Sequence, residues 1–171
     1  MKIIKLLLPL CVGYILANGQ EKVEQLQIEW PREYEWQIVS QQDDSAQMST
    51  IIIPGYENTN NATIMGTMRV MKAVRLSNTD EMLAHYRSHL DSGSVLTVLD
   101  KLEKGSHHWV LFKVETPVTS KYPIAESDLY IVIQGDYGLY ENYVAIKESS
   151  LSKDFIRKWA KVLKSGKFIS Q

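Results

Sequence analysis

The sequence predicts an α+β domain, in which an antiparallel sheet of about six or seven strands carries two packed helices as an α/β/α sandwich. Three observations predict it. Short apolar runs of strand length alternate with polar turns, two segments show apolar residues at helical spacing, and no repeat or Pro/Gly-rich linker divides the 171 residues. The predicted order of elements is β-β-β-α-β-β-β-β-α.

The first half of the chain predicts three strands and a helix. Trp36, Ile38 and the run 49–53 flank a polar turn at 41–45, and residues 63–74, which are rich in Met and Val, form the third strand. Asn78 is a helix cap with Glu81 three residues later, and apolar residues then recur at helical spacing. We expect a helix over 79–92, closed by Gly93 in a left-handed conformation.

The second half predicts two hairpins and a closing helix. Residues 95–103 and 108–116 form the first hairpin, and residues 128–134 and 139–147 form the second. The second turn contains Gly135 and Gly138, which we expect to supply the positive φ of a tight turn. Residues 151–164 are amphipathic with one apolar face, and Ser150 is the expected cap of this helix.

Several of these features together resemble a known fold. They are the opening Trp30-Pro31, Trp36 on the first strand, the helix start at 78–81, the Tyr/Val-rich closing hairpin, and a last helix ending near 164–166. Over residues 30–168 the chain resembles the PsbP-like and Mog-type α/β/α fold and is similar to small secreted bacterial DcrB-like proteins. The resemblance implies a binding or accessory factor without catalysis, and it transfers no set of site residues.

The first 19 residues have the pattern of a secretory signal peptide. Lys2 and Lys5 precede an apolar run at 6–16, and the small residues of Ala17-Asn18-Gly19 provide a cleavage site. The run is too short to span a membrane, which takes about 20 apolar residues. We therefore expect a signal peptide at 1–19, a flexible polar lead at 20–29, and a single domain at 30–171 that is exported to the periplasm or the extracellular space.

Cys11 is the only cysteine, and it lies inside the apolar run. A lipoprotein, cleaved before this cysteine and anchored through it, is the alternative, but the bulky Leu10 argues against that cleavage. Cleavage after Gly19 leaves no thiol, which excludes disulfides and thiolate metal sites.

The charge of the predicted mature chain is mildly acidic. The full sequence has 19 Lys and Arg and 20 Asp and Glu residues, and loss of Lys2 and Lys5 leaves 17 against 20, a net charge of −3. This balance argues against nucleic acid as a partner. No later segment is long and apolar enough for a transmembrane span.

The histidines are candidate metal ligands. His85 and His89 are four residues apart on the predicted helix, so their imidazoles point the same way. The hypothesis is that the two imidazoles bind one zinc or copper ion. The alternative is that both flank the buried face, half-exposed. His107 and His108 are neighbours on a predicted strand, so at most one of them joins such a site.

Three methionines also suggest soft-metal ligation, but their positions argue against it. Met65, Met68 and Met71 lie on a predicted strand, where Met68 faces away from the other two. We therefore expect all three to pack in the core.

Aromatic residues on and near the last hairpin are the candidate interaction surface. They are Trp109, Tyr130, Tyr137, Tyr140 and Tyr143. Tyrosine and tryptophan are favoured at interfaces because they combine an apolar ring with a polar atom. The alternative is that these rings only cover the sheet, as aromatic residues in strands commonly do.

No serine elbow, phosphate loop or complete dinucleotide fingerprint occurs in the sequence, so no catalytic or cofactor-binding residue is assigned. The predicted function is an exported, non-catalytic binding or accessory protein whose partner is a protein or a small ligand. One alternative is a metal-binding envelope protein that uses His85 and His89. Another is a small hydrolase whose active residues meet only in the fold.

Overall fold

The computed structural model describes residues 24–103, 107–119 and 123–170, and the predicted signal peptide and Cys11 lie outside them. It contains nine strands, two α-helices and one short 3-10 helix. The elements are β1 (Glu24–Gln27), η1 (Arg32–Tyr34), β2 (Gln37–Asp43), β3 (Gln47–Ile53), β4 (Ile64–Met71), α1 (Thr79–Ser88), β5 (Val95–Leu102), β6 (Trp109–Thr116), β7 (Glu126–Gln134), β8 (Leu139–Ile146), α2 (Lys153–Leu163) and β9 (Lys167–Ser170).

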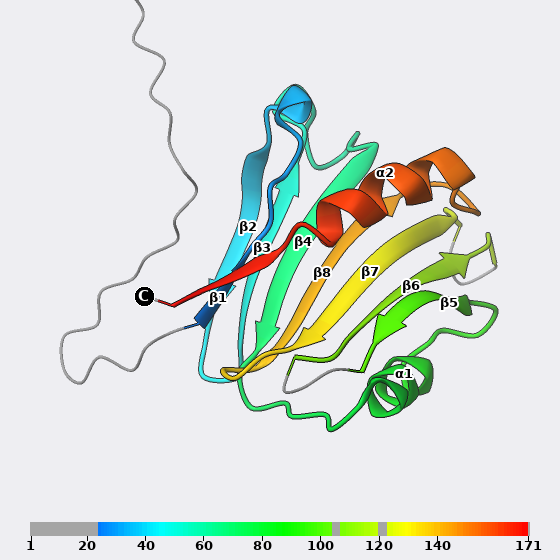
Figure 1. The fold of residues 1–171 in the computed structure, drawn as a ribbon. Helices are drawn as coiled ribbons and strands as arrows, with labels where there is room; N and C mark the ends of the chain where they lie inside the picture. The colour runs from blue at the N-terminus through cyan, green and yellow to red at the C-terminus, as the bar shows by residue number, and fades with distance from the viewer. Residues whose placement is uncertain (1–23, 104–106, 120–122, 171) are drawn as a thin grey trace, which may run out of the picture.

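Seven of the strands form one antiparallel sheet in the order β2-β3-β4-β8-β7-β6-β5. Neighbours in sequence are neighbours in the sheet except where β4 pairs with β8, which joins the first half of the chain to the second (Figure 1). This confirms the α+β class and the antiparallel sheet of seven strands.

The two helices cover opposite faces of this sheet. Trp159 and Leu163 of α2 pack in one core cluster with Leu129 and Ile131 of β7. Met82 and Leu83 of α1 pack in the other cluster with Val132 of the same strand and with Val110 and Phe112 of β6. Because successive side chains of a strand point to opposite faces, one apolar strand such as β7 supplies both cores.

Helix α1 begins where the sequence predicts it and ends earlier. The Asn78 side chain accepts a hydrogen bond from the Glu81 backbone N–H at 2.8 Å, which caps the helix. The helix ends at Ser88, however, and His89 is its C-cap, so the predicted end at Ser92 is wrong. Gly93 does adopt a positive φ of 93°, but it lies in the turn before β5.

Helix α2 is amphipathic as predicted, but it begins two residues later than expected, at Lys153. Ser152, and not Ser150, is the N-cap, and its hydroxyl accepts from the Phe155 N–H at 3.1 Å. Trp159 is 1% exposed and Leu163 is fully buried, so the apolar face lies against the sheet.

Two strands were not expected from the sequence. β1 and β9 pair antiparallel as a separate two-stranded ribbon, with Leu26 opposite Phe168. Figure 1 shows this ribbon on the same side of the sheet as α2, crossing in front of the strands β2 to β4. Residues 24–27 of the predicted lead at 20–29 thus form a strand, and the order of elements gains a strand at each end.

The β7–β8 turn differs from its predicted conformation. Among the described glycines only Gly93 has a positive φ, so Gly135 and Gly138 do not serve the turn in that way. Gly135 is needed for space instead: a Cβ there would lie 2.4 Å from Glu24 Oε2 and 2.6 Å from Tyr140 Cε2. The glycine lets the ribbon approach the turn.

None of the helices in the described ranges has the length and apolarity to cross a membrane.

Candidate functional site

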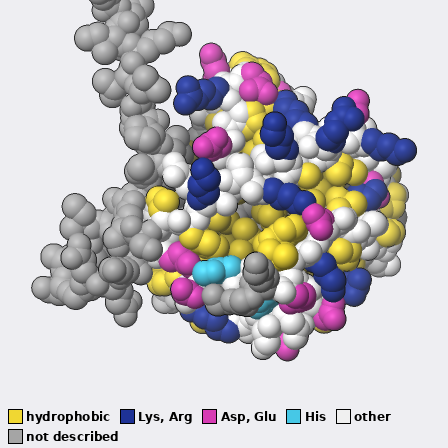
Figure 2. All heavy atoms as spheres, viewed as in Figure 1, with side chains coloured by type: hydrophobic (Ala, Val, Ile, Leu, Met, Phe, Trp, Pro, Cys, Tyr) yellow, Lys and Arg dark blue, Asp and Glu magenta, His cyan; other side chains and the backbone are white. Residues whose placement is uncertain are grey.

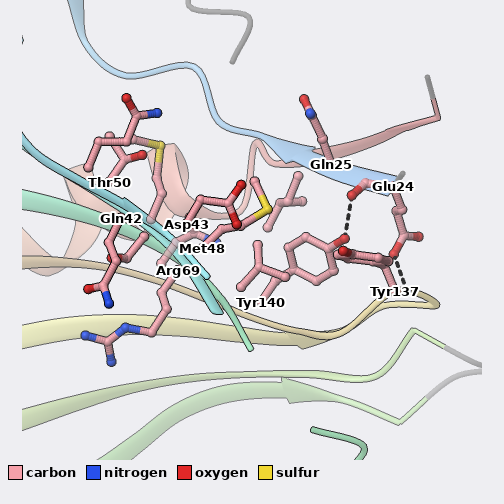
Figure 3. A pocket seen from close by; sticks show the side chains of 15 residues that line it. Glu24, Gln25, Gln42, Asp43, Met48, Thr50, Arg69, Tyr137 and Tyr140 are labelled. Atoms are coloured by element: carbon pink, nitrogen blue, oxygen red, sulfur yellow. Dashed lines mark hydrogen bonds between the residues drawn. The ribbon is translucent and has the colours of Figure 1, made fainter. Parts of the chain in front are cut away.

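A cavity lies between the ribbon β1-β9 and the sheet strands β2, β3 and β4, and we call it the ribbon pocket (Figure 3). Its volume is about 540 Å³. Small-molecule sites usually have volumes of about 300–1,000 Å³. Its lining consists of Glu24, Gln25, Leu26, Gln41, Gln42, Asp43, Met48, Ser49, Thr50, Met68, Arg69, Val70, Tyr137, Tyr140 and Asn142.

The floor of the ribbon pocket is formed by side chains on the α2 side of the sheet. In one row across the strands, Asn142 of β8 is opposite Met68 of β4, and Met68 is opposite Thr50 of β3. In the next row, Tyr140 is followed by Val70 and Met48. Alternation along each strand therefore places two methionines, a valine and an aromatic ring on one apolar floor.

β1 forms the roof, and two hydrogen bonds fix it to the β7–β8 hairpin. The Tyr140 hydroxyl donates to the Glu24 backbone oxygen at 2.7 Å, and the Tyr137 backbone N–H donates to Glu24 Oε2 at 3.2 Å (Figure 3). Burial, together with the nearby Glu24 carboxylate, raises the pKa of Tyr140, so its hydroxyl stays a donor at neutral pH. The roof depends on the four residues of β1.

Trp30 bounds the pocket near Met68. Its indole Nε1 donates to Met68 Sδ at 3.3 Å. Its ring also packs closely against Gly66, where an added Cβ would lie only 2.7 Å from Trp30 Cζ3. Trp30 also contacts Trp36 and Trp159, with ring centroids 5.5 and 6.1 Å apart. Gly66 is therefore required for the aromatic cluster that positions Met68.

Asn142 is the polar group of the floor that lacks a protein partner. It is 2% exposed, and its side-chain Nδ2 has no hydrogen-bond acceptor among the described residues. A buried donor without a partner costs about 1–3 kcal/mol of stability. Such a group next to a cavity is suited to a ligand atom that accepts its hydrogen bond.

The charged side chains of the lining are held by different partners, and not all of them face the pocket. Asp43 pairs with Lys72 at 2.6 Å, and Glu24 holds the hairpin as described above. The Arg69 guanidinium binds Glu141 at 2.9 Å, and Glu141 points to the face opposite Asn142 and Tyr140 because it lies between them in β8. The polar edge of the pocket therefore carries the carboxylates of Glu24 and Asp43. The charge of Arg69 is neutralised by Glu141 on the opposite face of the sheet.

A second cavity is smaller. It has a volume of about 160 Å³ and lies at the other end of β4 and β8, where Ile53, Met65 and Ala145 contribute to its lining. Its volume is below the usual range of about 300–1,000 Å³ for small-molecule sites.

The α1 side of the sheet holds a buried acidic cluster. The Tyr86 hydroxyl of α1 donates to Glu141 at 2.5 Å, and Asp128 on β7 is 7% exposed. Burial, with the nearby Glu126 and Glu141 carboxylates, raises the pKa of Asp128 to about 7. Neither of the two cavities is lined by Asp128.

His85 and His89 lie together on α1, with ring centroids 4.8 Å apart. His89 Nδ1 is engaged by the His85 backbone oxygen at 2.7 Å, which leaves Nε2 of that ring for another partner. Among the described residues no third His, Cys, Asp or Glu completes a metal-binding group with this pair. Metal binding by His85 and His89 therefore stays a prediction.

The other two histidines lie just before β6 and have different partners. His108 is buried, and its Nε2 lies 2.8 Å from the Leu76 backbone oxygen. His107 lies beside the ribbon, where its Nε2 is 3.6 Å from Glu24 Oε1 and 3.9 Å from Asp136 Oδ1. Neither of them joins His85 and His89.

The five candidate aromatic residues do not form one surface. Tyr130 and Tyr143 are neighbours on the α1 side, with ring centroids 4.6 Å apart. Tyr137 and Tyr140 line the ribbon pocket on the other side, and Tyr140 is 1% exposed, so it is not an exposed contact residue. Trp109 lies under the Lys164 ammonium, 5.0 Å from its ring centroid.

The three methionines do not converge, as predicted, but only Met71 packs against a core cluster. Met68 faces the ribbon pocket, Met71 packs against the α1-side core, and Met65 lines the smaller cavity, so the three sulfur atoms do not converge.

Sequence reasoning missed Asn142 and Glu24, which are central to the pocket. A polar residue inside the apolar alternation of 139–146 was a signal for Asn142. No local signal marks Glu24, because its role depends on the pairing of β1 with β9.

A scan against protein-family models found no family that matches this chain. A search of curated proteins also found no match.

Proposed function

We propose that this protein is an exported, non-catalytic binding protein that holds a small amphipathic ligand in the ribbon pocket. The observation that carries the proposal is the Asn142 amide, which is buried without a partner in the floor of a cavity of about 540 Å³. Export rests on the signal peptide predicted at 1–19.

The lining defines the chemistry of the ligand. Met48, Met68 and Val70 accommodate an apolar body, and methionine adapts to irregular shapes. Asn142 Nδ2 requires a hydrogen-bond acceptor such as a carbonyl, ether or hydroxyl oxygen. Glu24 and Asp43 at the polar edge disfavour an anion. The ligand is therefore uncharged or cationic, with an oxygen acceptor on an apolar framework.

The lining favours binding over hydrolysis. Ser49 and Thr50 carry the aliphatic hydroxyls at the pocket, and its lining includes no histidine, lysine or cysteine that would activate one of them as a nucleophile. The carboxylate of Glu24 accepts a backbone hydrogen bond, and that of Asp43 pairs with Lys72. A hydrolase remains the alternative, for which turnover of model esters that Thr50→Ala or Ser49→Ala abolishes would be the supporting result.

The resemblance to PsbP-like and DcrB-like proteins stays a prediction. An antiparallel sheet with helices on both faces supports it.

The uncharged fluorescent amine N-phenyl-1-naphthylamine tests the pocket. We expect its emission to rise on binding to the protein, and Thr50→Trp, which fills the cavity from β3, to weaken its affinity at least tenfold. Thr97→Trp is the matched control, because Thr97 is exposed on β5 and outside the pocket. Equal affinity of the two variants would refute the proposed site.

The natural ligand is accessible by native mass spectrometry of protein purified from the organism that makes it. We expect an additional small mass on the wild-type chain and its loss in Thr50→Trp. Because Asn142→Leu removes the donor and keeps the volume, it should release a ligand bound through an oxygen acceptor and still bind the apolar dye.

A further inference from the structure

Three metal-ligating side chains from distant parts of the sequence converge beside the ribbon pocket. Glu24 lies on β1, His107 lies just before β6, and Asp136 lies in the β7–β8 turn. One ligand atom from each residue lies within 4.8 Å of the other two. Figure 2 shows histidine bordered by acidic side chains on the face that carries α2 and the ribbon.

The spacing of these atoms is close to that of an occupied metal site. Nitrogen and oxygen ligands at about 2.0–2.2 Å from a tetrahedral zinc ion are about 3.3–3.6 Å apart. His107 Nε2 is 3.6 Å from Glu24 Oε1 and 3.9 Å from Asp136 Oδ1. The Asp136 side chain is 77% exposed, so it has the freedom to close the remaining few tenths of an ångström.

Surrounding contacts already orient two of the ligands. Glu24 Oε2 accepts from the Tyr137 N–H, so its other oxygen is the one near His107. The His107 ring packs against Phe168 of β9, with centroids 5.1 Å apart. Contacts of this kind around the ligands are typical of metal sites, in which they fix ligand orientation.

The third ligand lies on a braced turn. The Arg75 guanidinium donates to the backbone oxygens of Asp136 and Tyr137 at 2.9 and 2.7 Å. These bonds use backbone acceptors and leave the Asp136 carboxylate available.

We propose that Glu24, His107 and Asp136 bind one divalent transition-metal ion, of which Zn²⁺ is the model, with water completing the coordination. Two carboxylates and a neutral imidazole carry a formal charge of −2, which matches the ion. The imidazole favours zinc or a similar metal over calcium, which takes six to eight oxygen ligands. The bound ion ties the roof strand β1 to β6 and to the hairpin turn. Glu24 also lines the ribbon pocket, but His107 and Asp136 do not, so variants at these two residues test the metal site without altering the pocket lining.

Isothermal titration with ZnCl₂ tests the site. The chain is used without a histidine tag and with Cys11→Ser, so that no thiol competes. We expect one zinc ion per chain, binding at least about a hundredfold weaker in His107→Ala and at least tenfold weaker in Asp136→Asn. The double variant His85→Ala/His89→Ala is the matched control and keeps the wild-type affinity. Because the Asp136 side chain is exposed, Asp136→Asn tests the site with little effect on the stability of the fold.

A second measurement separates a metal site from a histidinium paired with two carboxylates. Zinc binding to the folded state should raise the melting temperature of the wild type and of the His85/His89 control, and leave that of His107→Ala unchanged. The proposal is overturned if the wild type takes up no zinc, or if His107→Ala binds zinc as tightly as the wild type.

Discussion

Asn142 lies in the middle of β8, where its neighbours on the same face are apolar or aromatic. Its Nδ2 has no hydrogen-bond partner among the described residues, and an unpaired buried donor lowers the stability of the ligand-free fold. A side chain that costs stability at the floor of a cavity is expected where binding, and not folding, determines the residue.

Replacing Asn142 with leucine should therefore stabilise the protein. The change keeps the approximate volume and removes a buried donor, so we expect the free energy of unfolding to rise by about 1 kcal/mol in urea denaturation. Asn142→Ala, which removes the same amide but enlarges the cavity, should gain less or lose stability. A loss above about 1 kcal/mol in Asn142→Leu would contradict an unpaired amide.

Asp128 should make stability depend on pH. Its pKa is raised to about 7 in the fold from an ordinary value of 3.8, so the folded state binds this proton more tightly than the unfolded chain. The stabilisation is fully present below about pH 4 and is lost as the pH rises to about 7. Over that window the loss is at most about 4 kcal/mol, at about 1.4 kcal/mol per pKa unit.

Asp128→Asn removes this titration. Urea unfolding at pH 5, 7 and 8.5 should show a smaller decline for the variant than for the wild type, and the variant should be the more stable of the two at pH 8.5. Asp80→Asn is a suitable control, because Asp80 is exposed and pairs only at the surface with Lys101. If the free energy of unfolding changed with pH in the same way for the wild type and Asp128→Asn, the raised pKa of Asp128 would be contradicted.

Among the elements, the hairpins and helices were predictable because their signals are local. Asn78 and Glu81 mark the start of α1 within four residues, and largely apolar runs of strand length on either side of a Gly-containing turn mark β7 and β8. The ribbon was not predictable in this way. β1 has the sequence EQLQ with one apolar residue, and its partner β9 is more than a hundred residues away. Local patterns carry no record of such a pairing.

The same distinction applies to the pocket and its surroundings. The two rows of the floor follow from strand alternation once the register is known, but the register of β4 on β8 is a property of the folded sheet. Gly135 and Gly138 were recognised as turn residues because a positive φ was expected there, but neither adopts one. The role of Gly135 is to admit Glu24, and that depends on the ribbon.

Gly135→Ala should displace the ribbon from the hairpin. The new Cβ would lie 2.4 Å from Glu24 Oε2 and 3.1 Å from Phe168 Cε1, so these two side chains, one on each strand of the ribbon, must shift. We expect a loss of about 1–3 kcal/mol in the free energy of unfolding, as for other overpacked sites. Hydrogen exchange should become faster at residues 24–27 and 167–170.

Gly93→Ala is the control for that exchange experiment. Its positive φ makes alanine unfavourable, so the variant also loses stability, but Gly93 lies in the turn before β5 and away from the ribbon. Ribbon exchange that accelerates equally in both variants would contradict the contact made through Gly135.

In the whole molecule, the ribbon and the seven-stranded sheet differ in how firmly they are held. β7 and β8 are buried on both faces, whereas the ribbon has two short strands and its own hydrogen-bond ladder, separate from the sheet. Short isolated ladders open with small free energies. The roof of the pocket is therefore the mobile part of the site, and the floor is the rigid part.

Hydrogen exchange should resolve this difference. Amides of β1 and β9 should exchange at least a hundredfold faster than those of β7 and β8, because their opening does not require global unfolding. A disulfide between Gln25→Cys and Ile169→Cys, which are directly opposite in the ribbon, should slow that exchange and the release of the bound dye. Equal protection of ribbon and sheet would show that they open together.

The pairing of β1 with β9 also sets an order of events during synthesis. The seven strands of the sheet and both helices lie between these two segments in the chain, so they can assemble while β1 still lacks its partner. Only when residues 167–170 have left the ribosome does the pocket receive its cover. A chain in which residues 167–170 are still unpaired would thus leave the floor of the pocket uncovered.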